Sequence, residues 1–525
     1  MKASTVTRRL ERFHVAGGGL KSTKRPNILF IVSDQMVAEL TSAYGHPLVQ
    51  TPHLLRLAEE GVRFDSAYTP FPLCAPGRAC IVSGRHASEI GAWDNGAPLT
   101  CDHPTFATYL AAAGYDTVLS GKMHFVGPDQ LHGFRQRLTT DIYSSDFGWV
   151  KEEWIGIKET RGADFDEVMG DRNRYNAAGY AGDAVHVDRW HTALSYDEET
   201  HFRAVEYLRA QGQAGNRERP FLLVASYHHP HEPFWPPQAY WDMYADGDVD
   251  IAEFPAGFEA GRSQMDLNLN AYHGVTRFDL RDADSMRRLR SAYHGLTTYM
   301  DDKVGGLLAT LQETGLADNT VVVFASDHGD MLCEREMVQK RCFYEWSARV
   351  PLIVRFPDGW KKGTTMTTPV SLLDLLPTFN DLAGVQEALP HDGDSLIPLL
   401  ESGEDADRVV FSQAHEAVGM PCIMARQGRY KYNYIHGYDP QLFDLEADPK
   451  EWTNLARQAV HDDTAARLRG MILERFGDPD VMHQNNLESL YRRRLIAGVM
   501  KDYGQTWSHD PALDHRKGAM QQYLP

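Results

Sequence analysis

The sequence is short of cysteine, of long hydrophobic runs and of positive charge, and each shortage excludes a class of protein. Six cysteines in 525 residues are too sparse for a disulfide framework, and none is spaced as a C-x-x-C motif. No apolar run approaches the ~20 residues that a membrane-spanning helix needs. The formal net charge of −19 argues against a nucleic-acid partner, because binding a polyanion requires clustered lysine and arginine.

The first 25 residues lack the hydrophobic core of a secretion signal. The segment is basic and contains Gly17-Gly18-Gly19, which predicts a flexible tail over residues 1–25 and not a targeting peptide. We therefore expect a cytoplasmic protein with no membrane partner. Because the chain as a whole is acidic, an anionic substrate must be attracted locally, by a metal ion or a few placed cations.

The composition and the apolar pattern are those of a packed α/β protein. Hydrophobic residues make up 42% of the chain and aromatic residues 10%, which is typical of a large globular core. Continuous short apolar runs indicate buried parallel strands, and they alternate with helical patterns. The predicted strands are Asn27–Val32, Thr117–Leu119, Phe221–Ala225, Thr320–Phe324 and Pro351–Val354. The predicted helices are Thr51–Gly61, Phe106–Ala113, Glu199–Gln211, Ser285–Gly315 and Leu372–Leu382.

Changes in composition and in the apolar pattern divide the rest of the chain into three segments. Residues 26–404 predict a large α/β domain, in which the polar stretch 150–198 predicts a lid or substrate-facing loops. Residues 405–477 predict a small antiparallel sheet. Its strands are expected at Val409–Ser412, Ile423–Arg426 and Tyr430–Ile435. Residues 478–525 predict a tail that packs across the body or onto a neighbouring subunit.

Acidic residues follow two of the predicted buried strands. Asp34 comes after the first strand, and Asp327-His328 follows the strand at Thr320–Phe324. Ligands of open α/β sheets gather at these strand ends, and two carboxylates suit a hard divalent cation such as calcium, magnesium or manganese. The alternative is that each acid caps the helix after its strand. The recurrence at separate strand ends favours a metal site.

Cys74-Ala75-Pro76-Gly77-Arg78 is the start of a predicted helix, because proline is tolerated at a first helical position. Cys74 would then face a helix N-terminus, where the dipole and free N–H groups favour an anion, with Arg78 one turn further in. Such a place can activate a nucleophile and hold an oxyanion. The alternative is an ordinary buried cysteine at a helix start.

These motifs resemble those of type I sulfatases of the alkaline phosphatase superfamily. The pattern Cys-x-Pro-x-Arg at 74–78, with Ser83-Gly84 after it, is similar to the family signature. The other matching positions, in family order, are Asp34, Gly121-Lys122-Met123-His124, Pro230-His231-Glu232-Pro233, Ser326–Gly329, Lys340, Gln441–Pro449 and Asn454–Ala456. The likeness runs from about residue 26 to 475. It implies a large, mostly parallel sheet flanked by helices, with a smaller C-terminal antiparallel sheet.

The resemblance implies a nucleophile and a metal. In the family the cysteine is oxidised to formylglycine by a maturation enzyme, which implies the same change at Cys74. One oxygen of its hydrate attacks the sulfur of the ester. The implied metal is calcium, with manganese or magnesium as alternatives, and it lowers the pKa of that oxygen and neutralises sulfate charge. The implied metal ligands are Asp34, Asp327, His328 and the residue-74 oxygen.

The same resemblance assigns roles to five further side chains. Arg78 and Lys122 orient the hydrate, while Lys340 and His231 bind sulfate and assist the leaving oxygen. His124 takes the proton from the second hydroxyl, so that the aldehyde re-forms and sulfate is expelled.

One branch, the choline-sulfatases, is matched more closely. The matching stretches are Ser120–Phe134, Arg137–Tyr143 and Asp146–Trp149, together with a single acid at Asp34-Gln35. We therefore leave Gln35 out of the metal set. Trp149 matches the branch's tryptophan, which suits a quaternary ammonium, and Asn95 is a second expected substrate contact. Against choline, residues 160–195 do not match, and the expected Trp-Asp pair near the pocket is Trp507-Ser508.

The sequence thus predicts a sulfatase for sulfate monoesters, with alkyl esters such as choline-O-sulfate favoured and aryl sulfates as further substrates. The expected partners are a small sulfate ester, the maturation enzyme and further copies of the chain, in a dimer or tetramer. Two alternatives are a phosphonate monoester or phosphodiester hydrolase of the same superfamily and a silent binding protein with an unmodified Cys74. A thiol redox protein using Cys74 and Cys80 is disfavoured by their spacing.

Overall fold

The computed structural model describes residues 25–161, 168, 176–214, 219–385, 389–504 and 506–511. The tail predicted over residues 1–25 lies outside the described residues except for Arg25. So does the end of the predicted C-terminal tail, from residue 512 onwards.

A large mixed sheet forms the core, in the order β5-β4-β6-β1-β7-β8-β2-β9. Its centre is parallel: β1 pairs with β6 on one side and with β7 on the other, and β4 extends the sheet beyond β6. Every residue of β1, β6 and β7 is buried, as expected for apolar runs covered on both faces. The bounds are β1 Asn27–Asp34, β2 Val62–Phe64, β4 Asp116–Gly121, β5 Gln136–Arg137, β6 Phe221–Pro230, β7 Thr320–Ser326, β8 Leu352–Arg355 and β9 Thr364–Met366.

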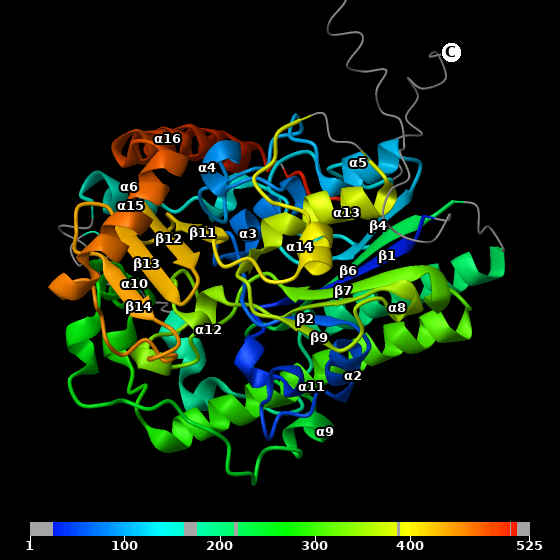
Figure 1. Ribbon diagram of the computed structural model, residues 1–525, viewed down its shortest axis with the longest axis horizontal. Coiled ribbons are helices and arrows are strands. Elements are labelled where there is room, and N and C mark those ends of the chain that lie inside the picture. The colour runs from blue at the N-terminus through cyan, green and yellow to red at the C-terminus, as the bar shows by residue number, and fades with distance from the viewer. Residues whose placement is uncertain are drawn as a thin grey trace, which may run out of the picture.

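Helices cover both faces of this sheet (Figure 1). One layer holds α3 (Cys74–Ser83), α5 (Phe106–Ala112), α13 (Leu375–Ala383) and α14 (Leu396–Ser402). The other holds α2 (Pro52–Glu60), α8 (Thr192–Ala214) and α11 (Ala283–Glu313). The predicted α/β fold class is therefore confirmed, including its flanking helices. Short elements complete this part of the chain: β3 (Ala67–Tyr68) paired with β10 (Val370–Ser371), α4 (Ala87–Ile90), α9 (Gln238–Trp241), α10 (Gln264–His273) and α12 (Glu345–Ala348).

A second, four-stranded antiparallel sheet lies beside the first (Figure 1). Its strands are β11 (Val409–Ala414), β12 (Cys422–Gln427), β13 (Tyr430–Ile435) and β14 (Gln441–Asp444), and α15 (Asp462–Phe476) packs on it. The predicted small sheet is present with one strand more than expected, because the family-like Gln441–Asp444 segment pairs with β13. The domain boundaries at residues 404 and 477 stay predictions.

Two helices lie in segments to which the sequence assigned no helix. The stretch 150–198 contains α6 (Glu152–Glu159), whose Trp154 and Ile157 are buried, so this part belongs to the packed body. The C-terminal segment forms the 25-residue helix α16 (Pro479–Tyr503), which lies against α6. Among the described residues, no helix is both long and apolar enough to cross a membrane. The cytoplasmic location stays a prediction.

Candidate active site

Cys74 is the first residue of α3, and the whole helix is buried. Leu73 precedes it in an extended conformation, and Pro76 fits the first turn because its missing N–H has no partner there. Gly77 is required by packing, since a Cβ at this position would lie 2.7 Å from the carbonyl oxygen of Phe71. The signature therefore folds into a helix start that points Cys74 at the ends of the central strands.

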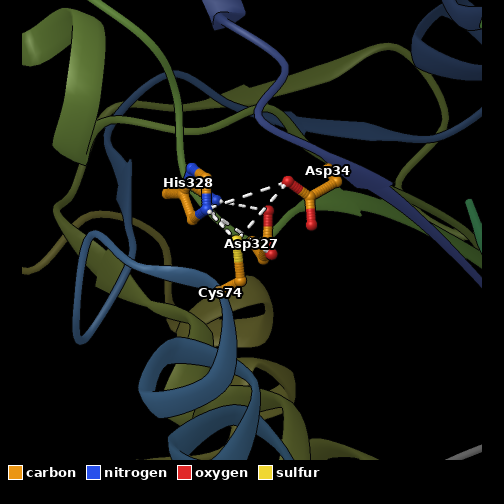
Figure 2. Close-up of side chains that lie close together, drawn as sticks. All are labelled: Asp34, Cys74, Asp327 and His328. Atoms are coloured by element: carbon orange, nitrogen blue, oxygen red, sulfur yellow. Dashed lines mark hydrogen bonds and ion pairs between the residues drawn. The ribbon is translucent and has the colours of Figure 1, made fainter. Parts of the chain in front are cut away.

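Four side chains converge at this point (Figure 2). Asp34 ends β1, Asp327 and His328 follow β7, and Cys74 points at them from α3. The Cys74 Sγ lies 3.2 Å from His328 Nε2 and 3.7 Å from Asp34 Oδ1. His328 Nε2 lies 3.9 Å from Asp34 Oδ1 and 3.7 Å from Asp327 Oδ2. Parallel strands that end at one edge thus bring distant residues together.

The chemistry of this quartet fits a divalent cation. One ligand atom from each of the four side chains lies within 4.8 Å of the others, and Asp34, Asp327 and His328 are fully buried. His328 Nδ1 donates to the Gly329 carbonyl at 2.9 Å, so Nε2 carries the lone pair that faces the carboxylates. An orienting hydrogen bond of this kind is usual for a metal-ligating histidine.

Two buried cations hold the carboxylates. Arg78 donates from Nε to Asp327 Oδ2 at 2.7 Å and from Nη2 to Asp34 Oδ2 at 2.9 Å. Lys122 Nζ lies 2.6 Å from Asp34 Oδ2. Burial alone would raise the pKa of Asp34, but the Lys122 and Arg78 cations together hold that pKa well below its ordinary value. Asp34 is therefore a carboxylate at neutral pH.

Two further hydrogen bonds hold the Arg78 guanidinium in place. Its Nη1 donates to the Lys122 carbonyl at 2.6 Å and to Ser226 Oγ at 2.7 Å. The guanidinium therefore joins α3 to β1, β4, β6 and the segment after β7, and it has little freedom to leave the carboxylates.

His231 and Lys340 form a second pair above the quartet. Lys340 donates to His231 Nε2 at 3.0 Å, and His231 Nδ1 donates to the Glu232 carbonyl at 2.9 Å. Burial and the neighbouring Lys340 hold the pKa of His231 well below its ordinary value. His231 is therefore a neutral acceptor here, and Lys340 is the donor of the pair.

Gln35 uses its side chain away from the quartet. Its Oε1 accepts from Lys340, and its Nε2 donates to Glu232 Oε2 at 2.9 Å and to Asp330. Only its backbone N–H reaches the proposed ligands, donating to Asp327 Oδ1 at 3.2 Å.

His124 lies beside Cys74 on the chain that leaves β4. Its ring packs against Tyr143, with centroids 4.6 Å apart, and against Trp149 at 5.2 Å. Burial lowers the pKa of His124, and Lys122 lowers it further, while the nearby Cys74 opposes the shift. A neutral imidazole next to residue 74 can accept a proton.

A cavity of about 360 Å³ opens over Cys74 and contains both predicted substrate contacts, Asn95 and Trp149. Its other lining residues are aromatic, charged or amide side chains: Tyr143, Lys151, Trp154, Asn176, His231, Glu232, Tyr272, Gln339, Lys340, Arg341 and Glu416. Glu416 is buried and neutralised, because Arg341 donates to its Oε1 from Nε at 2.9 Å and from Nη2 at 2.8 Å. The cavity can therefore hold a small ester whose organic part meets aromatic faces.

The wall around Asn95 depends on the last helix. Asn95 Oδ1 accepts from the Ala75 N–H at 3.1 Å, next to the signature cysteine. Its neighbour Asp94 is buried and accepts two hydrogen bonds, of 2.6 and 2.7 Å, from Arg493 of α16. This buried pair ties the C-terminal helix to the cavity.

A second histidine and acid cluster does not fit a metal. His46, Asp250 and His294 lie close together, but His46 Nδ1 accepts from the Leu48 and Val49 N–H groups. The hydrogen of His46 is therefore on Nε2, which faces Asp250 at 3.3 Å. Arg290 also neutralises Asp250, at 3.0 Å. These contacts make the cluster a structural ion-pair network.

Two family profiles match this chain and show the family to which it belongs. The profile described as Sulfatase matches residues 26–385. The chain is a member of the sulfatase family. A second profile, N-sulphoglucosamine sulphohydrolase C-terminal, matches residues 333–476 of this sulfatase, which spans the small antiparallel sheet.

Relatives of this sulfatase include two curated enzymes. The choline-sulfatase of Rhizobium meliloti (strain 1021) is 38% identical over 502 residues, covering 93% of this chain and 94% of the relative. An arylsulfatase of Clostridium perfringens (strain 13 / Type A) is 29% identical over 476 residues, covering 86% of this chain and 94% of the relative. The predicted family and the predicted sulfuric ester hydrolase are therefore confirmed.

Solved structures agree on the fold. A phosphonate monoester hydrolase of Agrobacterium radiobacter has a TM-score of 0.66 and 25% identity, covering 87% of this chain and 96% of that one. A protein solved with its substrate D-glucosamine-2-N,6-O-disulfate has a TM-score of 0.66 and 24% identity, covering 87% and 99%. The predicted sulfatase-like fold is confirmed.

The structure also shows cavity residues to which the sequence assigned no role. Tyr143 lies within a matched stretch, yet only the fold shows its ring over the Lys122 ammonium, 4.5 Å from the centroid. Arg341 and Glu416 belong to no motif, and no sequence signal marked them. The roles of the individual site residues stay predictions.

Proposed function

We propose that this sulfatase hydrolyses sulfate monoesters of small alcohols, with choline-O-sulfate favoured and aryl sulfates as further substrates. The observation that carries the proposal is the cavity over Cys74, which is lined by four aromatic side chains and by the carboxylates of Glu232 and Glu416. Aromatic faces attract quaternary ammonium groups. The identity of 38% to a choline-sulfatase along nearly the whole chain supports the same substrate class.

Residue 74 would act as formylglycine, made from Cys74 by a maturation enzyme, and its hydrate supplies the oxygen nucleophile. The metal would be held by Asp34, Asp327, His328 and the residue-74 oxygen, where it lowers the pKa of a bound hydroxyl and offsets sulfate charge. We propose calcium, because carboxylate oxygens dominate the donor set. Manganese and magnesium are the alternatives that metal analysis of the purified protein would distinguish.

The remaining site residues position groups and move protons. Arg78 and Lys122 fix the carboxylates of Asp34 and Asp327 and present positive charge to residue 74. This preorganised charge stabilises developing negative charge without rearranging in the transition state. His124, which lies beside residue 74, accepts the proton whose removal releases sulfate.

Lys340 and His231 serve the leaving oxygen. The hydrogen bond from Lys340 to His231 Nε2 leaves the ammonium as the group with protons to donate. We therefore assign Lys340 the donation to the departing alkoxide and His231 the orientation of that ammonium. Both side chains line the cavity, so both can meet the sulfate oxygens.

Kinetics on a panel of choline, simple alkyl and aryl sulfates would test the substrate. We expect kcat/KM to be highest for the choline ester. Equal values for choline and a neutral alkyl sulfate of similar size would contradict the choline proposal and leave the sulfatase assignment intact.

The alternative of a phosphonate monoester or phosphodiester hydrolase has one observation in its favour, the likeness to the Agrobacterium radiobacter enzyme. Against it, Lys122 and His124 stand at the positions that the sulfatase resemblance requires. A sulfate ester and a phosphonate monoester of the same alcohol would separate the two activities, and faster phosphonate cleavage would reverse our assignment.

A silent binding protein would keep the Cys74 thiol. Conversion to formylglycine lowers the mass of the peptide by ~18 Da, because an aldehyde replaces a thiol. Mass spectrometry of that peptide from active protein therefore decides between the two, and an unmodified thiol in active material would refute the proposed nucleophile.

We further propose that two copies pair through α16. Tyr491, Leu495, Val499 and Tyr503 are between 47% and 77% exposed and recur every fourth residue, which places them along one stripe of the helix. The stripe is symmetric about Ala497. If two antiparallel α16 helices cross at this residue, Leu495 lies opposite Val499 of the second copy and Tyr491 lies opposite Tyr503. Arg492 then lies opposite Asp502, so the same surface is complementary to itself, as a two-fold interface requires.

Size-exclusion chromatography with light scattering would test this pairing. We expect a dimer or tetramer for the wild-type chain and a smaller species for L495D/V499D. The control is V460D, at an exposed valine outside the stripe, which should leave the mass unchanged. A wild-type monomer at micromolar concentration, or an unchanged mass for L495D/V499D, would refute the interface.

A further inference from the structure

Asp141 contacts the backbone of the histidine segment without lining the cavity. Its Oδ2 accepts from the N–H of Met123 at 3.0 Å and from the N–H of His124 at 2.8 Å. Its side chain is only 4% exposed. A buried carboxylate that accepts two successive N–H groups fixes the path of the chain at that point.

The path needs fixing, because His124 has a φ of +56°. A non-glycine residue in the left-handed region is strained and persists only where its surroundings hold it. This left-handed residue turns the chain after β4, and the turn leaves the His124 ring beside residue 74. The two hydrogen bonds to Asp141 are those that hold this turn.

Asp141 is itself held by Arg137, which donates to the same carboxylate oxygen as the two backbone N–H groups. Arg137 donates from Nη2 to Asp141 Oδ2 at 2.6 Å, and from Nη1 to Gln130 Oε1 at 2.8 Å and to the Gln130 carbonyl at 3.0 Å. Nearby, Thr139 Oγ1 accepts from the Gly121 N–H at 2.8 Å. The segment 137–141 therefore runs as a clamp along 121–124.

The charge of Asp141 is secured by the same contacts. Burial alone would raise the pKa of its carboxyl, but Arg137 and the two backbone N–H groups hold that pKa below its ordinary value. The Asp141 side chain is therefore a carboxylate, which is a stronger acceptor for N–H donors than a neutral carboxyl group.

We propose that Asp141 is a positioning residue for His124: it holds the left-handed turn that presents the imidazole to residue 74, and so sets the rate at which sulfate is released. This inference rests on the proposed role of His124. Asp141 touches neither the substrate nor the metal ligands, and its effect must therefore pass through the histidine.

A double-mutant cycle tests this dependence. In otherwise wild-type enzyme, D141A should lower kcat on the order of 100-fold, the loss that a displacement of about 1 Å produces in a catalytic group. In the H124A background D141A should change kcat little, because residues that act through one another are not additive. Equal fold-losses in both backgrounds would overturn the proposal. Undiminished activity of H124A alone would refute the role of His124 instead.

Amide hydrogen exchange provides a readout that does not depend on turnover. It can therefore be measured on protein in which Cys74 has not been converted to formylglycine. D141A should speed exchange at Met123 and His124, whose N–H groups lose their acceptor. D141N should change exchange and kcat less than D141A, because its amide oxygen can still accept both N–H groups although the ion pair with Arg137 is lost. Unchanged exchange at 123–124 in D141A would also overturn the proposal.

Asp129 offers a matched control in the same loop. Its Oδ1 accepts from the N–H of Leu131 at 3.0 Å and of His132 at 2.9 Å, and His132 also has positive φ, at +41°. D129A should speed exchange at 131–132 and leave kcat close to wild type. A loss of kcat in D129A as large as in D141A would indicate general loosening of the loop and would count against a specific role for Asp141.

Discussion

The floor and the wall of the cavity are built in different ways. The floor consists of Asp34, Asp327, His328 and the cations Arg78 and Lys122, which lie at or beside strand ends and are at most 1% exposed. The wall comes from loops, from α6 and from the small sheet, and it includes partly exposed rings such as that of Trp149. In the function proposed above, the floor carries the chemistry of sulfate transfer and the wall selects the alcohol.

The difference shows where specificity can change without loss of chemistry. Each floor residue lies in an ion-pair contact with at least one other floor residue, so removal of one leaves a buried charge without compensation. Wall residues such as Trp149 line the cavity, and under the proposed function they would contact the organic part of the ester and leave the floor intact when they change. Substitutions should therefore divide into those that abolish kcat and those that alter KM for one substrate.

The largest effect is expected at Cys74, which points at the floor from α3 (Figure 2). C74A should abolish turnover, because no formylglycine can form, and should leave the circular dichroism spectrum unchanged, because alanine fits a buried helix start. C80A, at a buried cysteine two turns further along the same helix, is the control and should stay active. Turnover by C74A on any sulfate ester would rule out the aldehyde mechanism.

The next effect is expected at His124. H124A should lower kcat between about 100- and 10,000-fold, the contribution usual for a positioned general base, and covalently bound sulfate should then be visible in intact-mass spectra. H132A removes a ring that packs on Phe125, 4.4 Å between centroids, and should keep most activity. Slow turnover without retained sulfate would move the role of His124 to an earlier step.

A smaller and more selective effect is expected on the wall. W149A should raise KM for a cationic ester by about 2- to 30-fold, the equivalent of one cation–π contact, and should change KM for a neutral aryl sulfate less. W190A, at a tryptophan that is 67% exposed and outside the cavity, should change neither. Equal shifts for both esters would show that the ring packs without selecting charge.

The smallest effect concerns stability and arises from Lys158 of α6. Burial lowers the pKa of this lysine to about 8 from 10.5, so between these pH values the unfolded chain binds more protons than the folded one. The contribution of Lys158 to stability should therefore rise with pH across this window, on the order of 3 kcal/mol in total. Urea unfolding at several pH values would show this contribution as the difference in slope between wild type and K158M. In K303M, at a lysine paired with Glu198, the slope should remain.

Much of the floor could be predicted because its residues are attached to strong local patterns. Apolar runs located β1, β6 and β7, and the acids after β1 and β7 follow from the rule that parallel strands present ligands at their carboxyl ends. The helix start at Cys74 follows from Pro76. The sequence did not predict that β8 runs antiparallel to β7, because an isolated apolar run carries no sign of its direction.

The wall was less predictable because distant segments complete it. Glu416 reaches the cavity only through the placement of the small sheet, and Asp94 meets Arg493 across 399 positions of sequence. The helix α16 was predicted as a tail because its apolar residues are divided between a buried side, with Leu490 and Met500, and the exposed stripe around Leu495. A helix with two apolar sides has no amphipathic signature.

The Asp94–Arg493 pair has a consequence for the order in which the protein is completed during synthesis. Every floor residue, and Lys340 above it, has left the ribosome long before Arg493 is made. Until then Asp94 has no guanidinium to neutralise it, and the loop that carries Asn95 has no anchor on α16. A nascent or prematurely terminated chain can thus contain every floor residue while the wall of the cavity is still incomplete.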